Sequence, residues 1–158
     1  MGYPHYWKVN TDVSTETWND YKKFVRKAIE LIDGNRWGNS ADGDDKTTLL
    51  DCVEPVNIRG GHGTGDPYVA SENVETDDYI SFNGDAEKGH DHETFYVSLD
   101  NVGFNFCKTA RKPYDTIVLA CIIAGEKMGV FSKWSSDASS RDEMKSGFAL
   151  FYKTMENL

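Results

Sequence analysis

The fold of this chain is organised by one continuous stretch, NFCKTARKPYD at residues 105–115 followed by TIVLACIIA at residues 116–124. The second half is the most apolar part of the sequence. Pro113 suits the first position of a helix, because its missing N–H would be unpaired there in any case. Gly129 suits the position just past a helix end. The pattern therefore predicts a buried helix that runs from Pro113 to Met128.

Positive charge gathers directly before this helix. Lys108, Arg111 and Lys112 fall within five positions, although the chain carries a net charge of −9. A helix N-terminus favours anions, because its first N–H groups are unpaired and the helix dipole is positive there. The stretch thus predicts a binding site for a phosphate group. The alternative is that these cations only balance nearby carboxylates.

A second candidate is the glycine-rich segment RGGHGTGDP at residues 59–67. Its glycines allow the backbone to approach a ligand closely or to adopt positive φ. The segment lacks the closing lysine and hydroxyl residue of a Walker A loop, and no helical pattern follows it. We expect Arg59 and the amides of residues 60–65 to hold a phosphate, with His62 and Thr64 beside it. The alternative is a flexible connection.

Other side chains complete the predicted ligand site. Aromatic rings can stack on a nucleotide base, and polar side chains can hold sugar or phosphate oxygens. The candidate stacking residues are Tyr6, Trp7, Tyr114 and Trp134, and the candidate polar contacts are Thr109, Ser135, Ser136 and Asp137. The sequence therefore favours the binding or sequestration of a small phosphorylated ligand of nucleotide type.

The histidines offer a catalytic alternative. HGT at residues 62–64 and HET at residues 92–94 are similar to the paired His-x-Thr triplets of two-histidine phosphoesterases. In that family the imidazoles act as acid and base, and the hydroxyls hold the phosphate. The catalytic residues would then be His62, Thr64, His92 and Thr94. The two triplets lie closer together than is usual for that family, and their middle residues are not apolar, so binding without turnover is favoured.

A metal site is a weaker alternative. His90 and His92 flank Asp91, and two imidazoles beside carboxylates suit zinc or manganese. A strand would direct Glu93 to the opposite side, and the nearby sequence offers no third convergent ligand. We therefore predict neither a metal nor another cofactor.

Composition narrows the functional classes. Of 158 residues, 17 are basic and 26 are acidic, so binding to duplex nucleic acid is not expected. An acidic surface could occupy a basic groove on another protein, which makes an acidic protein-binding inhibitor the third hypothesis. Three cysteines without a CxxC pair indicate a reducing compartment. With no signal peptide and no apolar run of membrane length, we expect a cytoplasmic protein without membrane contact. The sequence also allows a homo-oligomer whose ligand pocket lies between subunits.

The remaining chain predicts short strands and two further helices. Strand patterns fall at residues 3–9 (an edge strand), 48–53, 56–59, 78–83, 92–99, 103–107 and 130–134. Residues 92–99 and 103–107 are expected to form a hairpin. A first helix is expected from Ser14 or Thr15 to Gly34, with its basic residues on a solvated face. Ser140 and Glu143 form a capping box for a last helix.

These patterns predict one α+β domain over residues 1–158, with a mostly antiparallel sheet and about three helices, one of them buried. The chain also resembles an uncharacterised family of small proteins found in phages and actinobacteria. The resemblance rests on HYW at residues 5–7, GGHGTGDP at 60–67, FNGD at 82–85, HETF at 92–95, FCKTARKPYD at 106–115 and SSD at 135–137. No activity is known for that family, so the resemblance implies only a phage or prophage context. There, in the host cytoplasm, small acidic proteins often counter host defence.

Overall fold

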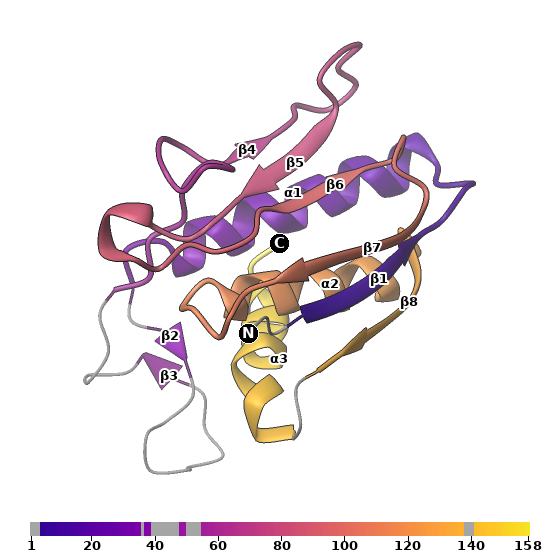
Figure 1. The fold of residues 1–158 in the computed structure, drawn as a ribbon. Helices are drawn as coiled ribbons and strands as arrows, with labels where there is room; N and C mark the ends of the chain where they lie inside the picture. Colours follow the sequence, from indigo (N-terminus) through magenta and orange to yellow (C-terminus); the bar gives the residue numbers. More distant parts are fainter. Residues whose placement is uncertain (1–3, 36, 39–47, 50–54, 138–140) are drawn as a thin grey trace.

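The computed structural model describes residues 4–35, 37–38, 48–49, 55–137 and 141–158 (Figure 1). Within these ranges, three α-helices pack with two small antiparallel sheets, and a further short strand pair is present. The predicted α+β class, the antiparallel pairing and the three helices are therefore confirmed. The helices are α1 (Thr15–Ile32), α2 (Asp115–Lys127) and α3 (Arg141–Glu156).

The central strand of the first sheet is β1 (Pro4–Val9). It pairs antiparallel with β7 (Gly103–Lys108) on one side and with β8 (Phe131–Ser136) on the other. The prediction that this segment is an edge strand is wrong. Pro4 is tolerated because it stands at the first position of the strand, where its missing N–H interrupts no interior part of the ladder.

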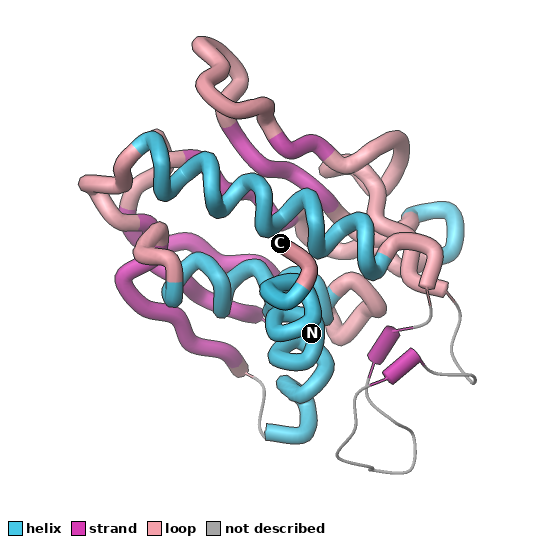
Figure 2. Tube along the Cα trace, turned by 180° about the vertical axis from the view of Figure 1, so that it is seen from behind, coloured by secondary structure: helices cyan, strands magenta, loops and turns pink. Residues whose placement is uncertain are grey.

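Side chains of β1 alternate between two environments. His5, Trp7 and Val9 are buried, whereas Tyr6 is half-buried and Lys8 is exposed. Successive side chains of a strand point to opposite faces of its sheet. The first sheet therefore has an inner face, packed against α2, and an outer face that points away from the helices (Figures 1 and 2).

The second sheet consists of β4 (Tyr68–Val69), β5 (Tyr79–Phe82) and β6 (Phe95–Ser98). The prediction of a hairpin between residues 92–99 and 103–107 is wrong, because β6 pairs with β5 whereas β7 pairs with β1. A hairpin signal is local. The strand β1 lies far away in the sequence, yet its buried backbone needs hydrogen-bond partners along both edges.

The third strand pair joins β2 (Trp37–Gly38) to β3 (Thr48–Leu49). Of the strand predicted at residues 48–53, the first two residues are paired, and residues 50–53 lie outside the described ranges. The strand predicted at residues 56–59 is represented by two isolated bridges, of Val56 with Asn35 and of Arg59 with Asn83. Between β5 and β6 the chain contains the short 3-10 helix η1 (Ala86–Lys88).

The first helix begins and ends where its sequence predicts. The Ser14 side chain accepts a hydrogen bond from the Thr17 amide at 3.1 Å, which caps the N-terminus of α1. Gly34 follows the helix with a φ of 77°, a conformation that favours glycine. The apolar stripe packs into the core and includes Trp18, Tyr21, Val25, Ala28 and Ile32.

The basic side of α1 differs from the solvated face expected from the sequence. The Lys22 side chain is fully buried. Its Nζ donates to the Ser71 carbonyl at 2.9 Å and to Asp78 Oδ1 at 2.8 Å. Arg26 donates to the Ala70 carbonyl at 2.8 Å. These cations bind the segment between β4 and β5 to the helix, because its carbonyls and Asp78 supply the acceptors.

The apolar helix α2 is buried at ten consecutive positions, residues 116–125. It packs against α1, α3 and β8, so residues 116–125 present no side to solvent, which explains why this stretch shows no polar stripe. It begins at Asp115 rather than at Pro113, with Tyr114 as its N-cap. Gly129 follows its end with a φ of 86°, as predicted.

The last helix, α3, packs across α2 and α1 (Figure 2). A hydrogen bond of 2.9 Å joins the hydroxyls of Thr116 in α2 and Ser146 in α3. Gly147 permits close approach, because a Cβ there would lie 2.6 Å from the Leu119 side chain. The predicted capping box of Ser140 and Glu143 lies outside the described side chains.

Two adjacent lysines of α1 test this packing. Replacing Lys22 by Ala should lower the free energy of unfolding by about 1–3 kcal/mol, because the Ser71 carbonyl and Asp78 lose their buried partner. Replacing Lys23 by Ala should cost less than about 0.5 kcal/mol, because its ion pair with Glu72 is exposed. Urea denaturation measures both values. Equal losses would contradict the conclusion that the buried hydrogen bonds of Lys22 stabilise the fold.

Candidate functional site

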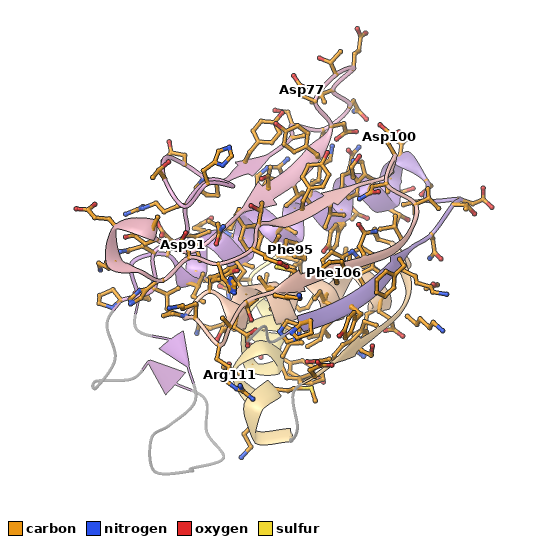
Figure 3. All side chains as sticks on the ribbon, viewed as in Figure 1. Asp77, Asp91, Phe95, Asp100, Phe106 and Arg111 are labelled. Atoms are coloured by element: carbon orange, nitrogen blue, oxygen red, sulfur yellow. The ribbon has the colours of Figure 1, made fainter. Side chains whose placement is uncertain are left out.

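The predicted cationic residues lie at one end of the first sheet, where β7 leads into α2. Residues 108–112, which we call the cationic turn, begin with Lys108 as the last residue of β7. The Lys112 amide donates to the Thr109 carbonyl at 3.0 Å, which closes the turn. Lys108 and Lys112 are half-buried, and Arg111 is exposed. Figure 3 labels Arg111 beyond the end of the first sheet and Phe106 on β7.

The cationic turn has an unusual backbone. Ala110 and Arg111 both adopt positive φ, of 52° and 56°. Positive φ at both central residues is the type I′ pattern, which normally uses Asn or Gly. For residues with a Cβ, the left-handed conformation costs about 1–2 kcal/mol each. The surrounding contacts must therefore hold this turn in place.

Two buried side chains supply those contacts. The Thr109 hydroxyl donates to Asp115 Oδ1 at 2.5 Å, and the Tyr114 hydroxyl donates to the Glu93 carbonyl at 2.5 Å. Both residues are fully buried. Thr109 therefore cannot reach a sugar, and Tyr114 presents no face to a base, contrary to the roles that the sequence suggested. Both anchor the turn instead.

The neighbouring thiol is also buried. Burial, followed by the charge of Glu93, raises the pKa of Cys107 well above its usual range. Burial and the Cys107 thiol likewise raise the pKa of Tyr114. A reactive cysteine needs the opposite, a lowered pKa. Cys107 is thus a core residue, and the cations that follow it do not activate it.

A polar network that the sequence did not reveal lies beneath the turn. His5 Nε2 lies 2.5 Å from Asp115 Oδ1, and His5 Nδ1 lies 2.7 Å from the Ser136 hydroxyl. When Nε2 carries the proton, it donates to the carboxylate, and Nδ1 accepts from the hydroxyl. The three residues come from β1, α2 and β8. The only available signal was that the strand pattern places His5 on the same face as Trp7.

This network has the composition of a Ser–His–Asp triad. However, His5 has an exposure of 0%, and the Asp115 oxygen that it contacts is shared with Thr109. The geometry is that of a paired buried cluster that joins β1, α2 and β8. Ser136 belongs to this cluster rather than to an open ligand site.

The network also changes the interpretation of the helix N-terminus. Asp115 lies in the first turn of α2. A carboxylate there already satisfies the preference of a helix N-terminus for negative charge. The prediction that this terminus seats a phosphate is therefore not supported, and any anion must be held by the cationic side chains themselves.

The glycine-rich segment is closed on itself. The Gly60 amide donates to the Thr64 carbonyl at 3.1 Å, and the Gly63 amide donates to the Gly60 carbonyl at 2.9 Å. A Cβ on Gly63 would lie 2.7 Å from that of Ala86, so the glycine allows the segment to pack against η1. Two of the amides expected to cradle a phosphate are thus already paired. His62 and Thr64 are exposed at its surface.

A buried amide side chain fixes this segment to its neighbours. Asn83 donates to the carbonyls of Gly61 and His92 at 3.2 and 2.9 Å, and its own carbonyl oxygen accepts from the amides of Gly84 and His92. Arg59 lies 3.7 Å from the carboxylate of Asp85. The predicted phosphate contact of Arg59 therefore competes with an internal carboxylate.

The two His-x-Thr triplets are brought near each other, but one hydroxyl is already used. The Thr94 hydroxyl donates to the Gly61 carbonyl at 2.5 Å, whereas His62, Thr64 and His92 are exposed. This arrangement gives the phosphoesterase alternative no pair of available hydroxyls. In the described part of the chain, no group of three or more His, Cys, Asp or Glu residues is placed to hold a metal ion, and His90 and His92 belong to no such group.

The outer face of the first sheet carries aromatic rings that the sequence analysis largely missed. Phe104 and Phe106 of β7 are 61% and 49% exposed. The Tyr6 ring stacks on Phe104 with centroids 5.7 Å apart, and Lys108 Nζ lies 5.8 Å from the centroid of Phe106. Alternation along β7 places these residues on one face. The alternation in the sequence does not reveal which face of the sheet is free of helices.

The other predicted contacts divide between the two faces. Trp7 is buried in the core, and half-buried Trp134 packs against Phe148 with centroids 6.5 Å apart. Ser135 is exposed and lies opposite Tyr6 in the β1–β8 register. Asp137 is exposed. Partial burial, followed by the charge of the Asp137 carboxylate, raises the pKa of the Tyr6 phenol. Tyr6 is thus the predicted stacking residue that lies on the outer face of the first sheet.

Comparison of the chain with protein-family models, curated proteins and solved structures finds no match. The phage context implied by the sequence motifs therefore stays a prediction. No helix in the described ranges is both long enough and apolar enough to cross a bilayer.

The strained turn gives a prediction of its own. Replacing Ala110 by Gly should raise the free energy of unfolding by about 0.5–1 kcal/mol, because Gly adopts positive φ without a Cβ penalty. The same substitution at Ala149, inside α3, should lower it by about 1 kcal/mol. Chemical denaturation measures the sign of both changes in the free energy of unfolding. A destabilised Ala110→Gly variant would contradict the conclusion that the backbone at Ala110 is strained.

Proposed function

We propose that the protein binds a small phosphorylated ligand of nucleotide type where the outer face of the first sheet meets the cationic turn. The proposed site consists of Tyr6, Phe106, Lys108, Arg111 and Lys112. The observation that carries the proposal is the position of Lys108, whose ammonium group lies over the exposed Phe106 ring, directly before the strained turn.

The two halves of such a ligand need different partners. A base needs a flat ring on which to stack, and a phosphate needs cations or N–H donors. Phe106 and Tyr6 are cross-strand neighbours on the outer face and supply rings. Lys108 is two residues beyond Phe106 on the same face and supplies a cation next to the base.

The charge distribution supports the same site. The chain has a net charge of −9, so its average surface repels anions. In the described part of the chain, no ion pair involves Lys108 or Lys112. Arg59 at the glycine-rich segment, in contrast, faces Asp85. A carboxylate also lies at the cationic turn, because the Lys108 amide donates to Glu93 Oε1 at 2.8 Å, but that contact does not involve the Lys108 ammonium group. The cationic turn is therefore the better anion site of the two.

The strain in the turn supports a functional role. Non-glycine residues with positive φ persist where the surrounding structure holds them, and they are concentrated at ligand-binding and active sites. Ala110 and Arg111 are held by Thr109 and Tyr114, which are buried on either side of them. Binding without turnover would sequester a nucleotide messenger, which is the counter-defence role that the sequence motifs suggested.

A nucleotide panel tests this function. Pure protein is incubated with AMP, UMP and cyclic di-AMP, and free nucleotides are quantified by chromatography before and after heating. We expect at least one nucleotide to be depleted and then recovered intact on denaturation. A new product would instead indicate catalysis, and undiminished free nucleotide throughout the panel would contradict the proposal.

Variants then locate the site. The double variant Arg111→Glu/Lys112→Glu should weaken calorimetric binding of the retained nucleotide roughly tenfold or more, because two attractive charges become repulsive. The control is Lys23→Glu on α1, which also replaces a basic residue by an acidic one but lies away from the site. It should leave the affinity within about twofold of the wild type. Unchanged affinity in the double variant would remove the cationic turn from the site.

A further inference from the structure

The outer face of the first sheet continues beyond the proposed nucleotide site. Beside Tyr6 and Phe106 it carries Phe104, and further along it carries Lys8 and Lys133. The register places Lys8 opposite Phe104 on one side and opposite Lys133 on the other. Tyr6 and Phe106 therefore lie between two groups of cations, the cationic turn at one end and the Lys8–Lys133 pair, level with Phe104, at the other.

The Lys8–Lys133 pair is unfavourable in the protein alone. Side chains directly opposite each other on neighbouring antiparallel strands have Cβ atoms about 4.5–5.5 Å apart, and like charges there are destabilising. In the part of the chain that the structure describes, neither lysine takes part in an ion pair. An acidic chain thus places two unneutralised ammonium groups side by side, which a bound anion would relieve.

The spacing of the cations indicates a ligand with more than one phosphate group. Lys8 pairs with Phe104, and Lys108 lies four residues further along β7. At about 3.4 Å per residue, the backbone positions of the two groups of cations are roughly 14 Å apart. A mononucleotide carries its phosphate at one point and cannot neutralise both ends, whereas a polynucleotide can.

We propose that this face binds single-stranded nucleic acid, with bases stacked on Tyr6, Phe104 and Phe106 and phosphates held at the two cationic ends. The inference rests on the proposed nucleotide binding and extends it along the sheet. Aromatic platforms flanked by cations bind single strands with little sequence preference, because every base has a stacking face. A duplex hides those faces, which agrees with the exclusion of duplex binding on net charge.

The second sheet provides an internal comparison. Its tyrosines also form a strip, with ring centroids of Tyr68 and Tyr79 4.7 Å apart and those of Tyr79 and Tyr96 5.3 Å apart. Near Tyr68, however, the neighbouring charges are the carboxylates of Asp77 and Asp78. This strip has rings without cations, so the proposal predicts that it contributes little to polynucleotide binding.

A length series separates the two proposals. Calorimetric titration with UMP, U2, U4, U6 and U8 at low salt should show affinity that rises steeply up to about four nucleotides and then levels off. With U6, log K should fall linearly with log salt concentration, by about 0.7 per phosphate contact. Parallel titration with dT6 shows whether RNA and DNA bind equally, and so which of the two is the ligand.

Variants identify the surface. Lys8→Gln/Lys133→Gln should weaken U6 binding roughly tenfold and reduce the salt slope by about one, while UMP binding changes less than about twofold. Phe104→Ala should also weaken U6 binding, through lost stacking. The matched controls are Lys23→Gln on α1 and Tyr96→Ala on the second sheet, and both should bind U6 like the wild type.

Each outcome decides one of the proposals. If UMP binds but U6 binds no more tightly, or the lysine variant leaves U6 binding unchanged, the polynucleotide inference is overturned and the nucleotide site stands. Binding of U6 without binding of AMP, UMP or cyclic di-AMP overturns the small-ligand proposal alone. If neither U6 nor any of these nucleotides binds, both proposals are overturned. If sedimentation shows a dimer that Phe104→Ala dissociates and U6 does not bind, the face is covered by a second copy of the chain, and the inference is wrong.

Discussion

The carboxylate of Asp115 is the contact on which the arrangement of this protein depends. One of its oxygens accepts hydrogen bonds from His5 and from Thr109 at the point where the buried helix α2 begins. Through Ser136, which contacts the other nitrogen of His5, the same cluster reaches β8. An unpaired polar group in such a place would cost several kcal/mol. The mutual pairing fixes the central strand, the turn and the helix in one geometry.

The surface features follow from this buried arrangement. Because α2 and the other helices occupy the inner side of the first sheet, the alternate residues of its strands must face outward. That geometry exposes Phe104 and Phe106 and aligns them with Tyr6. Because Thr109 and Tyr114 hold the backbone below, the cationic turn can keep two residues in an unfavourable conformation. The glycine-rich segment belongs to a separate cluster, which is organised by Asn83.

Local sequence patterns predicted the helices well and the pairing of strands poorly. The start of α1 after Ser14, the glycines that end α1 and α2, and the all-round burial of α2 each follow from a local signal and are present in the structure. The position of β1 between β7 and β8 depends on segments far apart in the chain, which no local pattern encodes. For the same reason Lys22 was placed in solvent, whereas Asp78 and the Ser71 carbonyl meet it in the fold. In the candidate site, the cationic cluster was visible in the sequence, but the burial of Tyr114 and the role of His5 were not.

The most direct measurement is chemical-shift mapping of the isotopically labelled protein during titration with UMP. We expect the shifted backbone amides to fall in residues 104–112 and at Tyr6 and its neighbours in β1. Signals from the glycine-rich segment at residues 59–67 should move little. Shifts confined to that segment, or to the second sheet, would contradict ligand binding at the first sheet, because they would place the ligand away from its cations and rings.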